Sequence, residues 1–420
     1  MSAPRAAILL TGNELLRGVI ADANGSFLAE QLEALGVPMT RMLVVGDGLA
    51  EIERGLLELA GEADLVITSG GLGPTHDDRT VEALARAAEK PLVLDREVLG
   101  KISVWTDSVA ARMGTDPLLF GPGNEKQAHI PEGASVLGLA GTAPGLVAQL
   151  GDAWVVVLPG VPSELRRLFE DVPSHPDLRA LFTAAEPRTR FQVRTYGISE
   201  SRVGDVFREL GGDPPGVETS ICARNYEIEI DVRATPGAVE AGRGLAEAMR
   251  AGLGEHVFAQ DERSLAQIVL DLAGARELTL ATAESCTGGL VAGMLTAVPG
   301  SSRSFLGGIV SYSNEAKHDL LGVPRELIAE HGAVSPEVAA AMAHGALERL
   351  GADLAVAVTG VAGPGGGTPD KPVGLVYLHV AGESGDAARQ LDWPGGRAVV
   401  RERSAVAALH LLRVQLGTAS

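Results

Sequence analysis

The sequence predicts an α/β protein with three domains: an N-terminal α/β domain over residues 1–168, a small α+β connector over 169–262 and a C-terminal α/β domain over 263–420. Three observations carry this prediction. A chain of 420 residues that is 45% hydrophobic can bury several cores, since domains usually contain about 100–200 residues. Strand-like and helical runs alternate in its first and last parts. Its 53 glycines gather in short loops, mostly after strand-like runs.

The first segment has the pattern of a parallel sheet. Strand-like runs cover residues 6–10, 42–45 and 65–68, and amphipathic helical stretches between them cover 27–35 and 52–60. This βαβαβ order predicts parallel strands joined by crossover helices. Ligands of such sheets sit beyond the carboxyl ends of the strands, so we expect the Gly-rich loops of this segment to converge on one rim.

The middle segment has scattered short strands and two helices. Strands are expected at 191–196 and 227–232, and helices at 201–210 and 238–253. Residues 227–232 alternate charged and apolar side chains, which predicts a half-exposed strand. We therefore expect a small α+β domain between the two larger ones.

The last segment returns to alternating strands and helices. A helix is expected from about Leu265, and Ser335 followed by Pro336 is a good start for a helix that runs to Leu350. Strands are expected at 278–281, 308–312, 354–359 and 373–380. These elements predict a second α/β domain with a core of its own.

The composition excludes several classes of protein. With 35 basic and 54 acidic residues the net charge is −19, which disfavours direct binding of nucleic acid through phosphate contacts. Apolar runs stay short of the roughly 20 residues of a membrane span, and the N-terminus leads into a strand rather than a signal peptide. We expect a soluble, cytoplasmic protein without membrane contact. Cys222 and Cys286 lack zinc-site spacing, so any metal is expected to have oxygen ligands.

One Gly-rich motif of the N-terminal segment suits phosphate and metal binding. It follows the strand 65–68 and precedes a helix expected from about Arg79, where glycines and a helix N-terminus can approach an anion. The predicted substrate-contact residues are Gly70, Gly71, Gly73, Thr75, His76 and, in a second Gly-rich loop, Thr142. Asp77 and Asp78, with Glu14 from the loop after the first strand, are candidate ligands of a divalent cation.

These carboxylates and the histidine also have simpler interpretations. Asp77 alone can cap the following helix, and Glu14 can be a solvated loop residue. One histidine beside two aspartates does not establish a base or a ligand, so His76 is kept only as a substrate contact.

The C-terminal segment offers three neighbouring nucleophiles between the strand 278–281 and a helix at Leu290. They are Ser285, Cys286 and Thr287, and Gly288 follows them. A hydroxyl there points at the carboxyl end of the strand, and we expect the free N–H groups of the helix's first turn to form an oxyanion hole. Cys286 is intrinsically the strongest nucleophile, but no histidine lies near it in sequence. The alternative is a capping hydroxyl beside tightly packed glycines.

A second motif supplies partners for a serine nucleophile. Gly308 begins the strand 308–312, Tyr312 ends it, and Lys317 follows on a helix. A lysine whose pKa is lowered by burial can activate a serine hydroxyl, so Ser285, Tyr312 and Lys317 are the candidate catalytic residues. The alternative for Lys317 is a surface helix residue paired with a carboxylate.

A third motif is the glycine-rich loop after the strand 354–359. A glycine nest beside a lysine suits a monophosphate, and a flexible hairpin loop is the alternative. The candidate substrate-binding residues are Thr359, Gly360, Gly363, Gly365, Gly366, Thr368 and Lys371, with Cys286, Thr287, Gly288 and Gly308 from the other two motifs.

These motifs, in this order along the whole chain, resemble those of the CinA family (competence/damage-inducible protein A). The resemblance implies a molybdopterin-binding-like N-terminal domain associated with metal-dependent ADP-ribose pyrophosphatase activity, a KH-type connector and a C-terminal nicotinamide mononucleotide (NMN) deamidase domain. It assigns Ser285 as the deamidase nucleophile and Tyr312 and Lys317 as its activating partners. Two positions depart from the family's pattern: Asn13, where an acidic residue is common, and Gly138-Leu139-Ala140, where an Asn-Pro pair is often found.

The resemblance thus predicts a hydrolase of pyridine-nucleotide salvage with two activities. The C-terminal domain converts NMN to nicotinate mononucleotide and ammonia without a cofactor. The N-terminal domain cleaves ADP-ribose to AMP and ribose 5-phosphate with Mg²⁺, Mn²⁺ or Co²⁺ held by Asp77, Asp78 and Glu14, and we expect a homodimer. The alternatives are a nucleotide- or pterin-binding module without turnover, and an accessory of competence that acts through a recombination protein as partner.

Overall fold

The computed structural model describes residues 4–383 and 385–418 of the chain. Its internal contacts divide the chain into two compact units. One is Met1–Arg190 with Pro215–Val217 and Arg233–Ala241, and the other is Phe191–Pro214, Glu218–Val232 and Gly242–Ser420. The domain boundaries predicted at residues 168 and 262 stay a prediction. None of the helices in the described residues is both long and apolar enough to cross a membrane.

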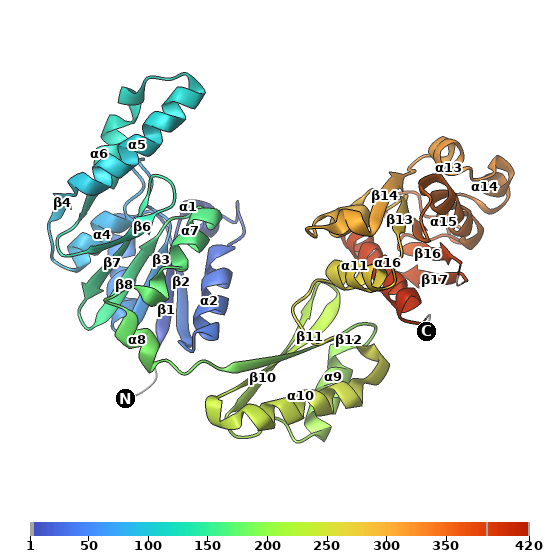
Figure 1. Cartoon of the computed structure of the whole chain (residues 1–420), viewed down its shortest axis with the longest axis horizontal. Helices are drawn as coiled ribbons and strands as arrows, with labels where there is room; N and C mark the ends of the chain where they lie inside the picture. The colour runs from blue at the N-terminus through green and yellow to red at the C-terminus, as the bar shows by residue number, and fades with distance from the viewer. Residues whose placement is uncertain (1–3, 384, 419–420) are drawn as a thin grey trace. The chain divides into compact units, whose positions relative to one another are not determined.

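The N-terminal unit is built around a six-stranded sheet with the strand order β2-β1-β3-β8-β7-β6 (Figure 1). Its strands are β1 (Ala6–Thr11), β2 (Met39–Val45), β3 (Leu65–Ser69), β6 (Ser135–Leu139), β7 (Pro144–Leu150) and β8 (Ala153–Leu158). β2, β1, β3 and β8 run parallel, which confirms the predicted βαβαβ start. β7 pairs antiparallel with β8, and β6 pairs antiparallel with β7 at the edge, so the sheet is mixed.

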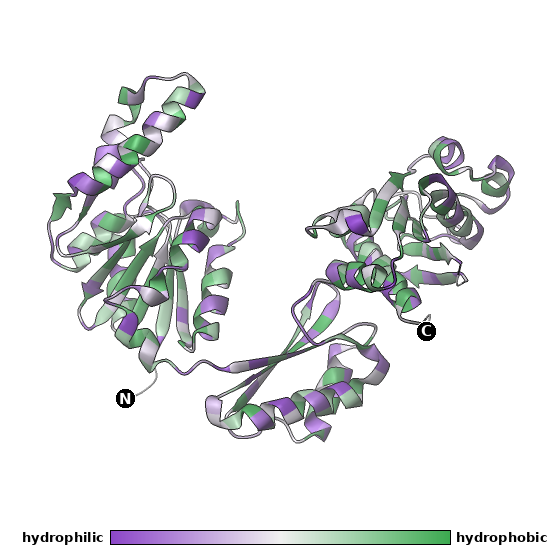
Figure 2. Ribbon diagram, viewed as in Figure 1, coloured by the Kyte–Doolittle hydropathy of each residue, from purple (hydrophilic) through white to green (hydrophobic). Residues whose placement is uncertain are grey.

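Helices cover both faces of this sheet. On one face lie α2 (Asn24–Ala34), α7 (Pro162–Phe169) and α8 (Arg179–Ala184), and on the other lie α3 (Leu49–Ala60) and α4 (Thr80–Ala87). Along β1, Ile8 and Leu10 pack with the first set of helices and Leu9 packs with the second. Burial on both faces explains the unbroken apolar runs of the sequence, and Figure 2 shows these strands as predominantly hydrophobic. The short helix α1 (Asn13–Leu16) follows β1 at the carboxyl edge of the sheet.

A small extension of the N-terminal unit occupies residues 92–131, where no helix or strand is predicted. It consists of β4 (Leu92–Leu94), α5 (Arg96–Met113), the 3₁₀ helix η1 (Pro117–Phe120), α6 (Gly121–Gln127) and β5 (His129–Pro131), which pairs with β4. Asp95 caps α5 by accepting hydrogen bonds from the amides of Glu97 and Val98. The extension matters for the site because α6 carries Lys126 and Gln127 to the loop after β3.

The middle of the chain forms a four-stranded sheet with the order β10-β11-β9-β12. It contains β9 (Thr189–Thr195), β10 (Val217–Arg224), β11 (Glu227–Ala234) and β12 (Val257–Ala259), and α9 (Glu200–Glu209) and α10 (Val239–Leu253) belong to the same part of the chain. These elements agree closely with the predicted strands and helices. The KH-type assignment stays a prediction.

The prediction that residues 227–232 form a half-exposed strand is wrong. Glu227 and Asp231 are buried, with 6% and 7% of their surface exposed. The Glu227 carboxylate accepts hydrogen bonds from Arg194 (2.6 Å) and His410 (3.1 Å). His410 belongs to the C-terminal helix α16 (Arg397–Thr418), so a helix distant in sequence contributes to the burial of charged residues that local alternation predicted to be exposed.

The C-terminal part contains a five-stranded mixed sheet with the order β14-β13-β15-β16-β17. Its strands are β13 (Leu280–Glu284), β14 (Phe305–Val310), β15 (Leu354–Gly360), β16 (Leu375–Gly382) and β17 (Ala387–Asp392), of which β14, β13 and β15 are parallel. The helices α11 (Leu265–Ala275), α12 (Leu290–Thr296) and α16 pack on one face, and α13 (Asn314–Leu321), α14 (Arg325–His331) and α15 (Pro336–Leu350) pack on the other. As predicted, Ser335 caps α15.

Two of these strands differ from the predicted ranges in a way that matters for the site. β13 ends at Glu284 rather than at residue 281, so Ser285 directly follows the strand. β14 ends at Val310, so Tyr312 lies beyond the strand instead of at its last position. Because the two strands are parallel neighbours, the segments that follow them meet at the same edge of the sheet.

Candidate functional site

Ser285 is held at the carboxyl edge of the C-terminal sheet by backbone hydrogen bonds on both sides. Its N–H donates to the carbonyl oxygen of Val358 on β15 (2.9 Å), and the N–H of Ser311 donates to the carbonyl oxygen of Glu284 (2.8 Å). These bonds join the ends of three neighbouring strands. Ser285 is itself buried, so its hydroxyl is held in a fixed environment rather than in a free loop.

The amine of Lys317 reaches this hydroxyl from the helix α13. The Nζ atom lies 2.9 Å from the Oγ atom of Ser285, 2.8 Å from the carbonyl oxygen of Ser311 and 3.4 Å from that of Tyr312. Only 1% of Lys317 is exposed. The alternative of a surface lysine paired with a carboxylate is therefore wrong, and among the described residues no carboxylate forms an ion pair with Lys317.

The environment of Lys317 favours a neutral amine. Burial lowers the pKa of Lys317, since an ammonium ion loses its solvation there. A neutral amine has two N–H donors and one lone pair. Two carbonyl oxygens are in place to accept the donors, and the Ser285 hydroxyl can donate its proton to the lone pair. The arrangement fits a general base on a serine.

The two other nucleophiles of this turn are less suited to attack. Burial raises the pKa of the Cys286 thiol to about 11, which leaves only about one thiolate in 10⁴ at neutral pH. Thr287 is fully buried, and its hydroxyl has no hydrogen-bond partner among the described residues. Among the described hydrogen bonds of these three nucleophiles, the contact with Lys317 provides a base for Ser285.

Glu284 is a functional residue that sequence reasoning missed. Its buried carboxylate accepts hydrogen bonds from the amides of Gly289 (3.0 Å), Val291 (3.1 Å) and Ala292 (2.8 Å) at the start of α12. The expectation that free N–H groups of this first turn form an oxyanion hole is therefore wrong for these three amides. The amides of Cys286 and Thr287, closer to Ser285, are not used by Glu284. The sequence signal that could have indicated this role is an acidic residue a few positions before Gly288-Gly289, where a helix begins.

Two arginines near the start of α16, also missed, join the motifs of this edge. Arg401 donates to the carbonyl oxygens of Cys286 (3.1 Å) and Thr287 (2.8 Å), which fixes the turn after Ser285. Arg397 donates to the hydroxyl oxygen of Tyr312 (2.7 Å) and to the carbonyl oxygen of Gly363 (3.0 Å). No residue pattern marked these arginines, because they lie at the far end of the chain.

Tyr312 takes a different place from the one its predicted role suggests. Its side chain is 60% exposed, its hydroxyl is bound to Arg397, and its contact with Lys317 is through the backbone carbonyl. The phenol therefore lies on the Arg397 side of the site, and its part in catalysis stays a prediction.

The glycine-rich loop after β15 lies at the same edge, and several of its predicted residues hold the loop itself. The Thr359 hydroxyl donates to the carbonyl oxygen of Ala333 (2.7 Å), and the Lys371 amine donates to that of His331 (2.5 Å). Thr368 accepts a hydrogen bond from the Lys371 amide (3.0 Å). Glycine is required at several positions for two reasons: Gly288, Gly363 and Gly366 have left-handed backbones, and a Cβ atom at Gly308 or Gly360 would collide with neighbours, whereas Gly365 stands in open space.

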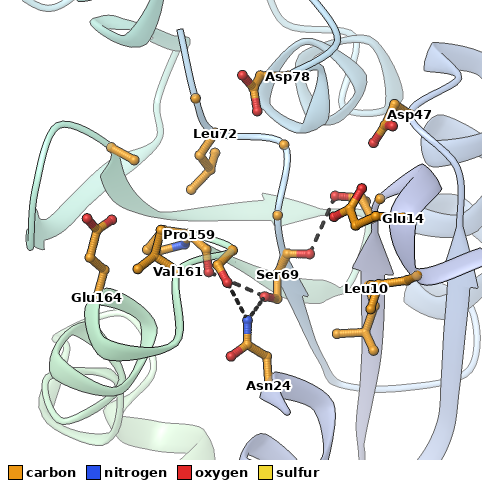
Figure 3. Close-up of a pocket in the computed structure, with 18 of the residues that line it drawn as sticks. Leu10, Glu14, Asn24, Asp47, Ser69, Leu72, Asp78, Pro159, Val161 and Glu164 are labelled. Atoms are coloured by element: carbon orange, nitrogen blue, oxygen red, sulfur yellow. Dashed lines mark hydrogen bonds between the residues drawn. The ribbon is translucent and has the colours of Figure 1, made fainter. Parts of the chain in front are cut away.

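The N-terminal unit has a second candidate site, a pocket of about 490 Å³ at the carboxyl edge of its parallel strands (Figure 3). The predicted residues that line it are Glu14, Gly70, Gly71, Gly73, Thr75, Asp77, Asp78 and Thr142. His76 is not among them, and its side chain is 95% exposed. The structure thus brings together eight of the nine predicted residues and leaves His76 outside.

Asp77 and Asp78 both form hydrogen bonds with Thr75 and do not cap the helix α4. Asp78 accepts hydrogen bonds from the amide (2.9 Å) and the hydroxyl (2.5 Å) of Thr75, and Asp77 also lies 2.5 Å from that hydroxyl. The first helical residue of α4 is Thr80, and its N-cap Arg79 makes no side-chain cap. The alternative in which Asp77 only caps the helix is therefore wrong.

Four lining or flanking residues of this pocket were missed by sequence reasoning. Burial, with the charges of Glu14, Asp77 and Asp78, raises the pKa of Asp47, so these carboxylates are close enough to repel one another. Figure 3 shows Glu164 across the pocket from Glu14 and Asp47, and burial raises the pKa of Glu164. Lys126, whose pKa is lowered by burial, donates to the carbonyl oxygen of Asp78 (2.8 Å). Asn24 donates to the carbonyl oxygen of Gly160 (2.8 Å) and to Ser69 (3.0 Å).

Two family models match the chain, and each covers the segment that contains one of the two candidate sites. The probable molybdopterin binding domain matches residues 7–179, and the CinA C-terminal domain matches residues 262–416. The CinA-like protein of Mycobacterium marinum is 44% identical over 418 residues, which covers 97% of this chain and 98% of that protein. The CinA-like protein of Mycolicibacterium gilvum is 46% identical with the same coverage. Among solved structures, the competence/damage inducible protein CihA from Agrobacterium tumefaciens is 45% identical over 37% of this chain and 94% of that chain, with a TM-score of 0.36.

Proposed function

Because this chain belongs to the CinA family over nearly its whole length, we propose that its C-terminal domain hydrolyses the carboxamide of NMN to give nicotinate mononucleotide and ammonia. One observation carries the proposal: the Ser285 hydroxyl and the Lys317 amine lie 2.9 Å apart in a buried site. A buried serine beside a lysine with no carboxylate partner among the described residues is an arrangement suited to acyl transfer.

The reaction proceeds in two halves through an ester on Ser285. Lys317 takes the hydroxyl proton while Oγ attacks the carboxamide carbon, and it then passes that proton to the leaving amide nitrogen, which departs as ammonia. In the second half, Lys317 takes a proton from water, the hydroxide attacks the ester, and the proton returns to Oγ as the acid is released. The amides of Cys286 and Thr287, whose carbonyls are fixed by Arg401, are the donors we assign to the oxyanion.

The phosphate of NMN is assigned to the edge formed by Arg397, Tyr312 and the glycine-rich loop. Arg397 already links Tyr312 to Gly363, so its guanidinium lies between a predicted catalytic residue and the predicted substrate-binding loop. Arginine binds phosphate through several N–H donors, and an exposed phenol beside it can add a further donor.

The test is product analysis with the full-length purified chain. NMN should yield ammonia and nicotinate mononucleotide in equal amounts, without added metal and with chelator present. Release of free nicotinamide instead of ammonia would show glycosidic cleavage, and absence of both products would overturn the proposal.

For the N-terminal pocket we propose metal-dependent cleavage of ADP-ribose to AMP and ribose 5-phosphate. The donor set fits a divalent cation such as Mg²⁺, Mn²⁺ or Co²⁺, since Glu14, Asp47, Asp77 and Asp78 are hard oxygen ligands whose mutual repulsion a cation relieves. Asp47, held by the amide of Asn13 (3.1 Å), supplies a carboxylate beside the position where the family often has an acidic residue. When bound, the cation would neutralise charge on the pyrophosphate and activate water.

The chain's own residues supply the rest of this site. Gly70 and Gly71 have left-handed backbones, which lets the loop after β3 approach an anion closely. Lys126 fixes the same loop from α6. The match to a molybdopterin-binding domain keeps a second candidate, a pterin- or nucleotide-binding module without turnover. AMP formation from ADP-ribose, measured with and without each metal, separates the two.

A further inference from the structure

Two histidines and an aspartate meet at one side of the C-terminal sheet, away from Ser285. His344 lies on α15, His379 on β16, and Asp386 in the turn before β17. The Nε2 atoms of His344 and His379 both lie 2.9 Å from the same oxygen of Asp386, Oδ2. The three ligand atoms lie within 4.8 Å of one another. No role assigned above uses them.

The direction of the strands separates this cluster from the deamidase site. Ser285 follows the carboxyl end of β13, whereas β16 runs antiparallel to β15 and starts at that edge. The turn between β16 and β17, which carries Asp386, therefore lies at the opposite end of the sheet. A ligand held there would not touch Ser285 or Lys317.

Each of the three side chains is placed by a different element, and each element is held independently. His379 is paired within the sheet, opposite Ala357 on β15 and Ala388 on β17. Gly385, next to Asp386, is held by α16, where the side-chain amide of Gln415 donates to its carbonyl oxygen (2.7 Å). The side chains of His344 and Asp386 are 53% and 38% exposed, so an ion can reach the cluster from solvent.

We propose that His344, His379 and Asp386 form a zinc-binding site that ties α15 to the hairpin of β16 and β17. Two imidazoles and one carboxylate form a borderline donor set that suits Zn²⁺, whereas Mg²⁺ and Ca²⁺ prefer oxygen alone. On binding, the metal replaces the two N–H···O hydrogen bonds, and each neutral imidazole carries its proton on Nδ1 instead. Water completes the fourth position.

The spacing of the three ligands along the chain does not reveal this site. His344 and His379 lie 42 and 7 positions before Asp386, which matches none of the short ligand spacings of zinc motifs. Only the pairing of β16 with β17 and the packing of α15 on β16 bring the ligands together. The expectation that any metal has oxygen ligands is based on the spacing of cysteines and histidines along the chain. Such spacing cannot reveal ligands that meet only in the fold.

The test is zinc binding by the untagged full-length chain after removal of metal with a chelator. Zn²⁺ is titrated in competition with a chromophoric chelator, for the natural sequence and for His344→Gln and Asp386→Asn. The natural sequence should bind one more equivalent of zinc than either variant, and each variant should weaken that equivalent by at least about 100-fold. His331→Gln, at a half-buried residue, and Asp319→Asn, at an exposed one, lie outside the cluster in the same domain. These matched controls should bind zinc like the natural sequence.

Two further readouts keep the outcome decisive. Co²⁺ at the site should give the visible absorption of a tetrahedral ion. Both ligand variants should lose this absorption. His344→Cys restores a ligand, so its absorption should return in altered form. Zn²⁺ should also raise the Tm of the natural sequence, by about 5 °C at saturation, and not that of the variants. Equal zinc stoichiometry and affinity in the natural sequence and in His344→Gln would overturn the proposal and leave the cluster as hydrogen bonds only.

Discussion

The two candidate sites hold their charged groups in opposite ways. In the C-terminal domain one amine, Lys317, is buried against carbonyl oxygens and the Ser285 hydroxyl. In the N-terminal pocket several carboxylates stand together, and burial, with the charges of its neighbours, raises the pKa of Asp47. Burial pushes the lysine toward its neutral, reactive form, whereas crowding leaves the carboxylates in need of a cation. In the proposed functions, the first site therefore works with its own residues and the second with a bound cation.

The largest effect should come from removing the nucleophile of the first site. Ser285→Ala should lower kcat for NMN by at least about 10⁴-fold while NMN binding by calorimetry changes little, because only the covalent step is lost. Cys286→Ala is the matched control and should keep activity within a few fold, since burial raises the pKa of its thiol and leaves little thiolate at neutral pH. The reverse pattern would identify Cys286 as the nucleophile.

Replacing the base should have the next largest effect. Lys317→Arg keeps a positive charge but cannot take up a proton at working pH, so kcat should fall by about 10²–10⁴-fold. The measurement is steady-state ammonia release, with the fold checked by circular dichroism. Turnover close to that of the natural sequence would show that Lys317 is not the catalytic base.

The carboxylates of the second site can be tested without disturbing the first. Asp77→Asn with Asp78→Asn keeps acceptors for Thr75 but removes two charges, so metal-dependent AMP formation should fall on the order of 100-fold. Deamidation of NMN should be unchanged. Asp152→Asn, at an exposed turn of the same unit, is the control. If the double variant still cleaves ADP-ribose like the natural sequence, these aspartates do not hold the metal.

The pH dependence of deamidation sharpens the contrast between the sites. Because the neutral amine is the active form of Lys317, kcat/KM should rise about tenfold per pH unit below its pKa and then level off. Burial lowers that pKa, so the plateau should begin below the pH at which a solvated lysine titrates. A profile measured from about pH 5 to pH 10 checks this. A plateau that begins only at the ordinary lysine pKa would contradict the effect of burial.

The two sites also differ in how much of them the sequence could predict. Glycines, aspartates and the Ser285 turn follow strands within a few residues, so the order of strands and loops places them at the sheet edge. Arg397, Arg401 and Lys126 could not be found, because each reaches its site from an element distant in sequence. Asp47 was missed although it follows β2 by two residues at the same sheet edge, where the same reasoning applies. Glu227 shows the same limit in the fold, since the alternation of its strand cannot show a covering helix.

The smallest effect on activity should come from removing everything before the C-terminal domain. In the described structure the contacts of Ser285 and Lys317 all lie within residues 263–420, so a fragment of these residues should deamidate NMN within about threefold of the full chain. Its stability should suffer more. His410 stacks on Tyr196 at 3.6 Å between ring centroids, meets Phe258 edge-on at 4.8 Å and donates to Glu227, and the fragment lacks all three partners.

A fragment of residues 191–420 is the matched control, because it keeps those partners of His410. Loss of two aromatic contacts and a buried hydrogen bond should cost on the order of 2 kcal/mol and lower the Tm by about 5 °C relative to the longer fragment. Equal Tm values would show that these contacts do not stabilise the domain. A shorter fragment that is folded but inactive would show that the site needs an earlier residue or a second chain.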